Sequence, residues 1–120
     1  MKADIAIAGG GLAGSLIAWR LRVARPDLSV VVIDKADRLG GNHTWSFHTP
    51  DLPASIFSWI EPLIVHRWPR QQVRFPSYER VLDTGYNSIT SERLHETVAP
   101  LLGDGFIADA AVAAVSAQQV

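Results

Sequence analysis

Short apolar runs and one longer amphipathic segment alternate along the first third of the chain. Residues 4–8 form a short, mostly apolar run that stops at glycine, which predicts a strand buried on both faces. From Leu12 the apolar positions change to a helical period, and Pro26 ends this segment, so a helix is predicted between them. Its apolar stripe is expected to consist of Ala13, Leu16, Ile17, Leu21 and Ala24.

A second apolar run, over residues 28–33, ends in consecutive β-branched residues and is typical of a central parallel strand. Asp34 stands at its carboxyl end. Residues 4–34 are therefore predicted to form a βαβ unit with a right-handed crossover. Such a crossover brings the glycine turn and Asp34 to one edge of the sheet, where ligands bind in open α/β folds.

The middle of the chain has a weaker pattern. Residues 42–76 mix prolines with tryptophans and show no sustained period, which predicts mostly loop with a short helix near residues 54–59. Residues 72–75 and 80–83 are expected to pair as a hairpin across a turn at residues 76–79.

One more helix and two more strands are predicted toward the C-terminus. Ser91 is expected to cap the helix, and Gly103 is expected to end it. Residues 106–108 and 111–117 read as strands. The apolar face of the helix is expected to be Leu94, Val98 and Leu101.

The glycine turn after the first strand carries the pattern G-x-G-x-x-G over residues 9–14. Gly9 allows a tight turn, Gly11 lets a pyrophosphate approach the backbone and the helix dipole, and Gly14 lets helix and strand pack closely. A glycine-rich turn can also be purely structural, but the flanking strand and helix favour a dinucleotide. The predicted cofactor-binding residues of this turn are Gly9, Gly11, Leu12, Ala13 and Gly14.

The acid at the end of the second strand fits the same ligand. Asp34 lies twenty residues beyond Gly14, where a carboxylate can accept both hydroxyls of the adenosine ribose. A 2′-phosphate would face this carboxylate, so NADP is disfavoured here, although Lys35 would offset part of that repulsion. The alternative is an aspartate that is merely exposed after a strand.

The residues that follow Asp34 distinguish FAD from NAD. Arg38 can supply charge-assisted hydrogen bonds, and Gly40 and Gly41 let the chain pass close to an extended cofactor. This spacing resembles the extension found in flavoproteins and favours FAD, while a helix stop at glycine is the structural alternative.

These elements predict an α/β fold built on a Rossmann-like FAD/NAD(P)-binding βαβ unit, with extra strands toward the C-terminus. A complete dinucleotide-binding enzyme usually needs more than 120 residues, so we expect the N-terminal part of an incomplete domain. The expected parts are a βαβ unit at 4–34, a glycine-pair and aromatic loop region at 38–76, and a hairpin, helix and strands at 77–120.

Composition narrows the function. A hydrophobic content of 48% and a charged content of 19% describe a globular protein, and a net charge of -1 leaves no basic surface for nucleic acid. The chain has no cysteine, which excludes disulfides and thiol nucleophiles and fits a reducing compartment. The four histidines have no metal-ligand spacing, so no metal site is predicted; His43 and His48 could instead face a cofactor or simply contact loop backbone.

The N-terminus imitates a secretory signal because Lys2 precedes the uncharged residues 5–19. Asp4, three consecutive glycines and the lack of a cleavage site oppose export. No apolar run approaches the roughly 18 residues of a membrane-spanning helix. We therefore expect a cytoplasmic protein whose membrane contact is peripheral, on the inner face.

The run Asn-His-Thr-Trp-Ser-Phe-His at residues 42–48 resembles the bacterial lycopene beta-cyclases of carotenoid biosynthesis, as do residues 62–69, 72–76, 85–86 and 89–91. This resemblance implies an enzyme that cyclises the linear ends of lycopene to give beta-carotene by way of gamma-carotene, without net redox change. It also implies FAD in its reduced form, with NAD(P)H as electron donor to the flavin.

Family members are several times longer than this chain, so the catalytic residues are unknown and the piece alone is expected to be inactive. Two alternatives remain open at this point. One is a flavin-dependent oxidoreductase of the monooxygenase or amine-oxidase type, which shares the glycine turn and the acid. The other is a non-catalytic dinucleotide-binding fragment.

Overall fold

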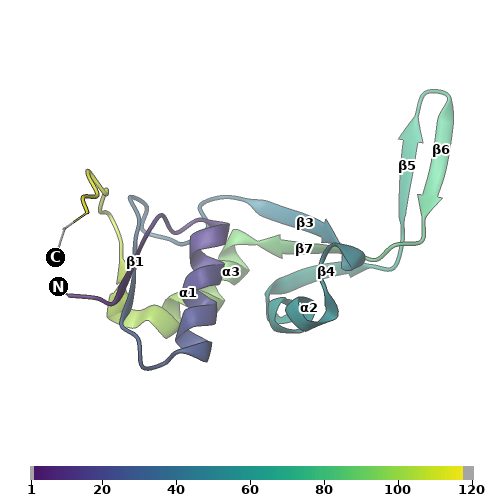
Figure 1. The fold of residues 1–120 in the computed structure, drawn as a ribbon. Helices are drawn as coiled ribbons and strands as arrows, with labels where there is room; N and C mark the ends of the chain where they lie inside the picture. The colour runs from purple at the N-terminus through teal and green to yellow at the C-terminus, as the bar shows by residue number, and fades with distance from the viewer. Residues whose placement is uncertain (1, 118–120) are drawn as a thin grey trace. The chain divides into compact units, whose positions relative to one another are not determined.

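The computed structural model describes residues 2–117, and its chain divides into two compact units (Figure 1). We call the first the glycine-turn unit, which consists of the described residues up to Asn42 and from Leu94 onward. We call the second the antiparallel unit, which is His43–Arg93.

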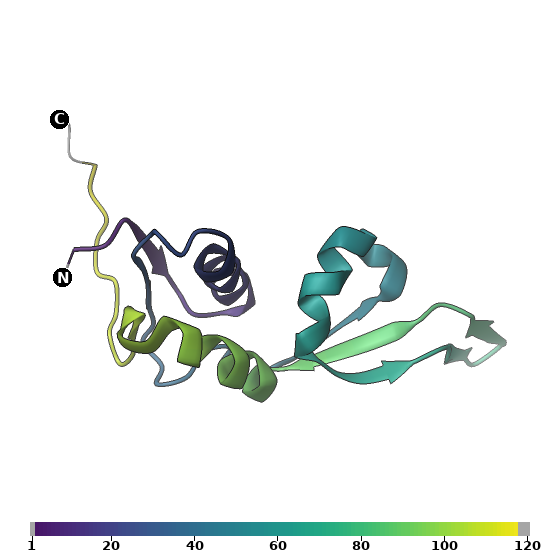
Figure 2. The ribbon, with the colours of Figure 1, turned by 90° about the horizontal axis from the view of Figure 1, so that it is seen from below.

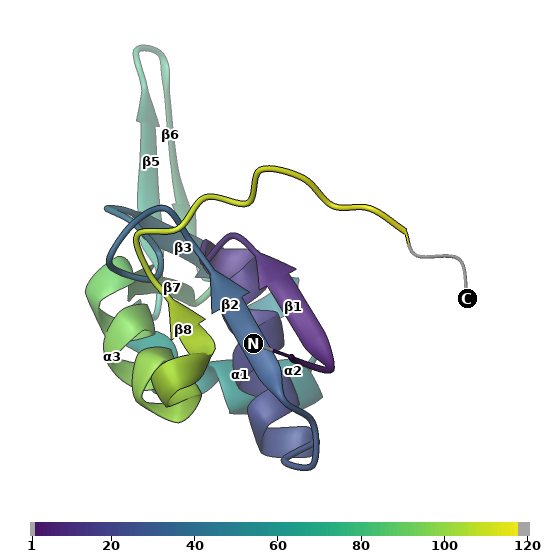
Figure 3. The same ribbon diagram turned by 90° about the vertical axis from the view of Figure 1, so that its left-hand side faces the viewer.

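The glycine-turn unit is built on a parallel sheet. Its strands are β1 (Ile5–Ala8), β2 (Val30–Ile33) and β8 (Phe106–Ile107), in the order β1-β2-β8. Helix α1 (Leu12–Ala24) connects the first two strands and lies behind them in Figure 3. The predicted βαβ unit and the α/β fold class are therefore confirmed.

Burial differs between the two main strands. Val30, Val31 and Val32 are all buried, as expected for a central strand. In β1, however, Ala6 and Ala8 are exposed, so the prediction that this strand is buried on both faces is wrong. Exposure alternates along the strand, with Ile5 and Ile7 half-buried between the exposed alanines, so the described chain covers only one face of β1.

The buried side of α1 is also different from the predicted stripe. Ser15, Ala18 and Trp19 are buried, whereas Ile17 is 53% exposed and Ala13 and Ala24 are exposed. Ser15 and Ala18 are small, which lets the helix lie close to the sheet, while Leu16 and Leu21 of the predicted stripe are half-buried.

Helix α3 (Ser91–Leu102) ends near Gly103, as predicted, and a short 3-10 turn, η3 (Gly103–Gly105), leads into β8. Two details were wrong. The cap is Thr90, whose hydroxyl accepts the N–H of Arg93 at 3.3 Å, and the buried face is Leu94, Val98 and Leu102 rather than Leu101. The predicted strand at residues 111–117 is also absent from the described chain, which has no regular structure there.

The antiparallel unit contains regular structure where mostly loop was predicted. Strands β3 (Thr44–His48), β7 (Tyr86–Thr90) and β4 (Ile64–Trp68) form a sheet in the order β3-β7-β4. Helix α2 (Ala54–Ile60) confirms the short helix and packs against one side of this sheet (Figure 2). Short 3-10 turns flank α2: η1 (Thr49–Asp51) and η2 (Glu61–Leu63).

The predicted hairpin is present with a tighter turn. Strands β5 (Gln71–Phe75) and β6 (Tyr78–Leu82) pair in antiparallel fashion, and Phe75 lies opposite Tyr78. Only two residues therefore connect the strands, fewer than the four expected. Within residues 2–117, no helix combines the length and the apolar character needed to cross a membrane.

Candidate functional site

The glycine turn joins the carboxyl end of β1 to the start of α1. Gly9 has φ +101°, a conformation that favours glycine, and its N–H donates to the carbonyl of Ile33 at 2.8 Å. Gly11 is the N-cap of α1 and has no side chain to accept the first-turn N–H groups. A Cβ added to Gly11 would meet nothing within 4 Å. The first amides of α1 are thus open to an acceptor from outside the chain.

Gly14 has the packing role that the sequence predicted. A Cβ at this position would lie 2.2 Å from the carbonyl oxygen of Gly9 and 3.2 Å from Cγ2 of Ile7. Only glycine lets the first turn of α1 come this close to β1.

Gly10, a position at which the G-x-G-x-x-G pattern requires no glycine, makes several hydrogen bonds within the turn. Its N–H donates to Oδ2 of Asp34 at 2.6 Å. Its carbonyl accepts the N–H of Gly40 at 2.7 Å and the hydroxyl of buried Ser15 at 3.0 Å. A Cβ on Gly10 would approach Cδ2 of Leu39 to 2.7 Å. One peptide therefore connects the turn, the acid, the helix and the glycine pair.

Asp34 lies at this junction and lines the adjacent pocket. Besides the Gly10 bond, its Oδ1 accepts the N–H of Ala36 at 2.8 Å. These backbone hydrogen bonds, Ala36 first and then Gly10, lower the pKa of the Asp34 carboxyl below its ordinary value. The carboxylate is ionised at neutral pH, and because each oxygen can accept more than one hydrogen bond, it can still accept from a ligand hydroxyl.

The loop after β2 folds back onto the turn. Gly40 has φ +83° and Gly41 has φ +62°, which accounts physically for a glycine at both positions. Leu39 between the acid and this pair is fully buried, and its N–H donates to Nδ1 of His95 on α3 at 3.0 Å. Arg38 is exposed. The glycine pair is thus brought against the glycine turn, and the predicted role of Arg38 at a cofactor remains a prediction.

His95 is a residue that the sequence did not single out. Its ring packs edge-on against Phe106, with centroids 6.2 Å apart. Burial lowers the pKa of His95, and the positive charge of Arg38 lowers it further. Since Nδ1 accepts the Leu39 N–H, the neutral ring is the form that fits this site.

We expect acidification to weaken the fold through His95. The pKa is lowered in the folded chain, so the stabilising contribution is complete above the ordinary histidine pKa of about 6.5 and is lost as pH falls toward the folded value. His95→Asn keeps an acceptor at the position of Nδ1 but does not titrate. Urea unfolding of the full-length protein between about pH 5 and 7.5 should show a smaller pH slope for His95→Asn than for wild type. Identical slopes would remove His95 from this role.

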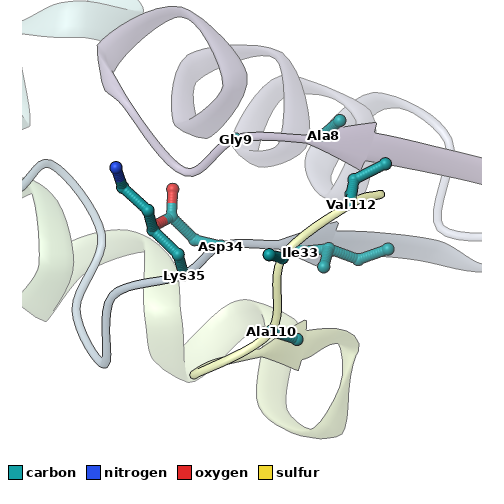
Figure 4. Close-up of a pocket in the computed structure, with 8 residues that line it drawn as sticks. Ala8, Gly9, Ile33, Asp34, Lys35, Ala110 and Val112 are labelled. Atoms are coloured by element: carbon teal, nitrogen blue, oxygen red, sulfur yellow. The ribbon is translucent and has the colours of Figure 1, made fainter. Parts of the chain in front are cut away.

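A pocket of about 330 Å³ opens beside the turn, within the size range of small-molecule sites (Figure 4). Asp34 and Lys35 lie at one end, and Ile33 and Val112 give an apolar surface at the other (Figure 4). The chain reaches the pocket after β8 because the N–H of Ala110 donates to the carbonyl of Asp34 at 3.0 Å. The other lining residues are Ala8, Gly9, Ala110 and Ala111.

The remaining candidates belong to the antiparallel unit. His43 lies against Trp45, with ring centroids 5.8 Å apart. Nε2 of His48 lies 2.6 Å from Nε2 of Gln71, within hydrogen-bond distance, and the backbone N–H of His48 donates to Oδ2 of Asp51. Whether either histidine faces a cofactor stays a prediction. Among residues 2–117, no three His, Cys, Asp or Glu side chains cluster as metal ligands.

Comparisons with known proteins point to one family. A family model described as lycopene cyclase protein matches residues 4–120. The lycopene beta-cyclase of Pantoea ananas is 49% identical over 117 residues, which are 98% of this chain and 31% of the relative. That of Pseudescherichia vulneris is 46% identical over 112 residues, 93% of this chain and 29% of the relative. The chain thus spans about three tenths of these relatives.

One solved structure shows the same fold at low sequence identity. It is a Photorhabdus luminescens protein provisionally described as an FAD-containing monooxygenase, which is 17% identical and has a TM-score of 0.53. The match covers 90% of this chain and 31% of that chain.

Proposed function

The chain belongs to the lycopene cyclase protein family, and from this premise we propose that the whole protein is a lycopene beta-cyclase. It would close the linear ends of lycopene into β-ionone rings and give beta-carotene by way of gamma-carotene. The observation that carries the proposal is the 49% identity to a lycopene beta-cyclase over 98% of the chain. Because the chain spans 31% of that relative, the activity is proposed for the whole protein.

Ring closure is an isomerisation in which atoms and electrons balance within the substrate. A proton adds to a terminal alkene carbon and leaves a carbocation, and a neighbouring double bond attacks that cation to form the ring. A proton is then lost from a ring carbon, so the product has the formula of the substrate. The reaction needs a general acid, a general base and a site that stabilises a transient positive charge. None of the described residues is assigned as the acid or the base.

We propose that FAD binds at the glycine turn, and the residues there fit it. The open amides beyond Gly11, at Leu12 and Ala13, would receive the pyrophosphate, since no side chain of the N-cap occupies them. Asp34 retains acceptor capacity for the adenosine ribose and would repel a 2′-phosphate. The full set of proposed cofactor-binding residues is Gly9, Gly11, Leu12, Ala13, Gly14, Asp34, Arg38, Gly40 and Gly41.

The proposed active form of the cofactor is reduced FAD, with NAD(P)H as electron donor to the flavin. When bound, the reduced flavin would supply negative charge near the developing carbocation. Lycopene and gamma-carotene are the proposed substrates. Because both are lipophilic, we further propose that the protein works in the cytoplasm with peripheral contact to the inner face of the membrane.

The test is anaerobic turnover by the full-length protein. With reduced FAD and lycopene in micelles, we expect gamma-carotene and then beta-carotene to form, as measured by chromatography and absorbance spectra. NAD(P)H should reduce the flavin but should not be consumed in proportion to product. Unchanged lycopene together with NAD(P)H oxidation coupled to oxygen would instead support a flavin-dependent oxidoreductase.

A further inference from the structure

A row of three aromatic side chains crosses the sheet of the antiparallel unit, whose strands lie side by side in Figure 1. His48 on β3 is paired with Tyr86 on β7, and Tyr86 is paired with Trp68 on β4. The ring centroids are 5.1 Å apart for the first pair and 5.9 Å apart for the second. The row is therefore continuous over all three strands.

The next row on the same face is made of small polar groups and one ring. Ser46 is paired with Ser88, and their hydroxyls lie 2.8 Å apart. Ser88 is paired in turn with His66, whose ring lies 5.7 Å from that of Trp68. We call the face formed by these two rows the neutral face: Ser46, His48, His66, Trp68, Tyr86 and Ser88.

The opposite face of the sheet already has a cover. Phe47 contacts Phe57 of α2 with centroids 6.3 Å apart, and Ile64 and Ile89 are buried on the same side. Arg67 also lies on this side, 6.0 Å from the Phe57 ring centre and paired with Glu61. The packed core and this ion pair thus lie away from the neutral face.

The neutral face carries no carboxylate, ammonium or guanidinium group on its six side chains, although Ser46, His66 and Trp68 are exposed. A sheet face that meets water is usually polar, and this face is polar while carrying none of those charges. Asp51, just past the end of β3, places Oδ2 3.7 Å from Nδ1 of His48, so one carboxylate borders the end of the aromatic row. The chemistry of the face suits a partner that is uncharged and contacts rings, rather than an anion or a nucleic acid.

We propose that the neutral face is one wall of the substrate site and holds an end of a linear carotenoid. The inference rests on the proposed function. A polyene end is an uncharged hydrocarbon, so a face without carboxylate, ammonium or guanidinium groups can receive it without desolvating a charge of that kind. The ring faces of Trp68 and Tyr86 also stabilise the positive charge that develops on the substrate during ring closure.

Substitutions in the full-length enzyme test this assignment. Trp68→Leu keeps an apolar side chain but removes the ring, and it should lower kcat for lycopene cyclisation about tenfold. Trp68→Phe should recover most of that loss, because the ring face is restored. Tyr86→Leu and Tyr86→Phe should behave in the same way. Flavin content and thermal unfolding are expected to match wild type.

The matched control is Phe75→Leu in the hairpin, an aromatic that is 62% exposed and lies outside the neutral face. It should leave kcat and KM unchanged. Wild-type kcat and KM in both leucine variants would overturn the proposal, as would an equal loss in Phe75→Leu. A shift in oligomeric state on size exclusion, with normal turnover, would assign the face to a second copy of the chain.

A binding measurement separates this inference from the proposed function. Lycopene in micelles should quench tryptophan fluorescence of the wild type, and Trp68→Phe should lose part of the quenching. Quenching without any cyclic product would overturn the proposed reaction but support carotenoid binding at the neutral face. Cyclic product with unchanged quenching and kcat in the Trp68 variants would support the proposed reaction and overturn the assignment of the neutral face to the substrate site. A wild type that neither binds nor cyclises lycopene would overturn both.

Discussion

Gly14→Ala is expected to abolish flavin retention and to lower the free energy of unfolding by about 2 to 3 kcal/mol. The new Cβ would lie 2.2 Å from the carbonyl oxygen of Gly9, and it would also lie 3.2 Å from Cγ2 of Ile7. The first contact is with backbone, which cannot move aside without opening the turn between β1 and α1. Urea unfolding of the full-length protein measures the stability loss, and the flavin absorbance of the purified protein measures retention.

Gly11→Ala is the matched control, because it separates folding from binding at the same turn. Gly11 has φ -69°, which alanine adopts without strain, and its added Cβ would meet nothing within 4 Å. We expect wild-type stability but weakened flavin retention, since the Cβ would occupy the space through which a pyrophosphate approaches the amides. Wild-type flavin content in Gly11→Ala would show that the pyrophosphate does not bind at this turn. Wild-type stability in Gly14→Ala would refute the packing argument.

Local features of the sequence predicted the βαβ unit well. The period change at Leu12 and the stop before Pro26 mark α1 because both depend on neighbours in the chain. Residues 30–33 are all apolar and β-branched, so the burial of this strand could also be predicted. The requirement for glycine at position 9 follows from a positive φ that a turn of this kind needs.

The contacts around Gly10 could not be predicted in the same way. They join residues separated by 24 positions for Asp34 and by 5 positions for the Ser15 hydroxyl, and no periodicity links them. The only available signal was a glycine at position 10, which the G-x-G-x-x-G pattern does not require. The bond between Leu39 and His95 spans 56 positions and had no signal at all.

The antiparallel sheet was missed for a different reason. In β3 aromatic residues alternate with Thr or Ser, as expected for a strand. The alternation covers only five residues, however, so it is a weak signal for a strand. Its partner β7 lies 38 to 46 residues away along the paired register, from Tyr86 opposite His48 to Thr90 opposite Thr44. The run at residues 42–48 was nevertheless informative, because its resemblance indicated the family that the comparisons confirm.

Asp34→Ala is expected to lower the free energy of unfolding by about 3 kcal/mol, because it leaves two backbone donors without their charged acceptor. The donors are the N–H groups of Gly10 at 2.6 Å and Ala36 at 2.8 Å. Flavin retention should fall as well, because the turn loses hydrogen bonds that hold it and the adenosine ribose loses its proposed acceptor. Stability and flavin binding therefore change together in this variant, and a second measurement is needed to separate them.

The pH dependence of stability identifies the carboxylate contribution. The pKa of Asp34 is lowered in the folded chain, so its contribution is complete above the unfolded pKa of about 3.9 and is lost as pH falls through the folded value. Asp34→Asn cannot titrate, and its NH2 group, a donor, replaces one of the two oxygens that accept the N–H groups of Gly10 and Ala36. We expect Asp34→Asn to be less stable than wild type at neutral pH. Its free energy of unfolding should also fall less steeply than that of wild type as the pH is lowered. An unchanged acid slope would mean that Asp34 does not hold the turn through its charge.

The ribose contact is tested by comparing FAD with an analogue that lacks the 2′-hydroxyl of the adenosine ribose. If Asp34 accepts that hydroxyl, the wild type should bind FAD about tenfold more tightly than the deoxy analogue, the scale of one charge-assisted hydrogen bond. Asp34→Ala should bind both more weakly but with little preference between them. A general collapse of the turn would weaken both ligands and leave the preference intact, whereas loss of a direct contact removes the preference itself. Equal discrimination in wild type and variant would confine Asp34 to its bonds with Gly10 and Ala36.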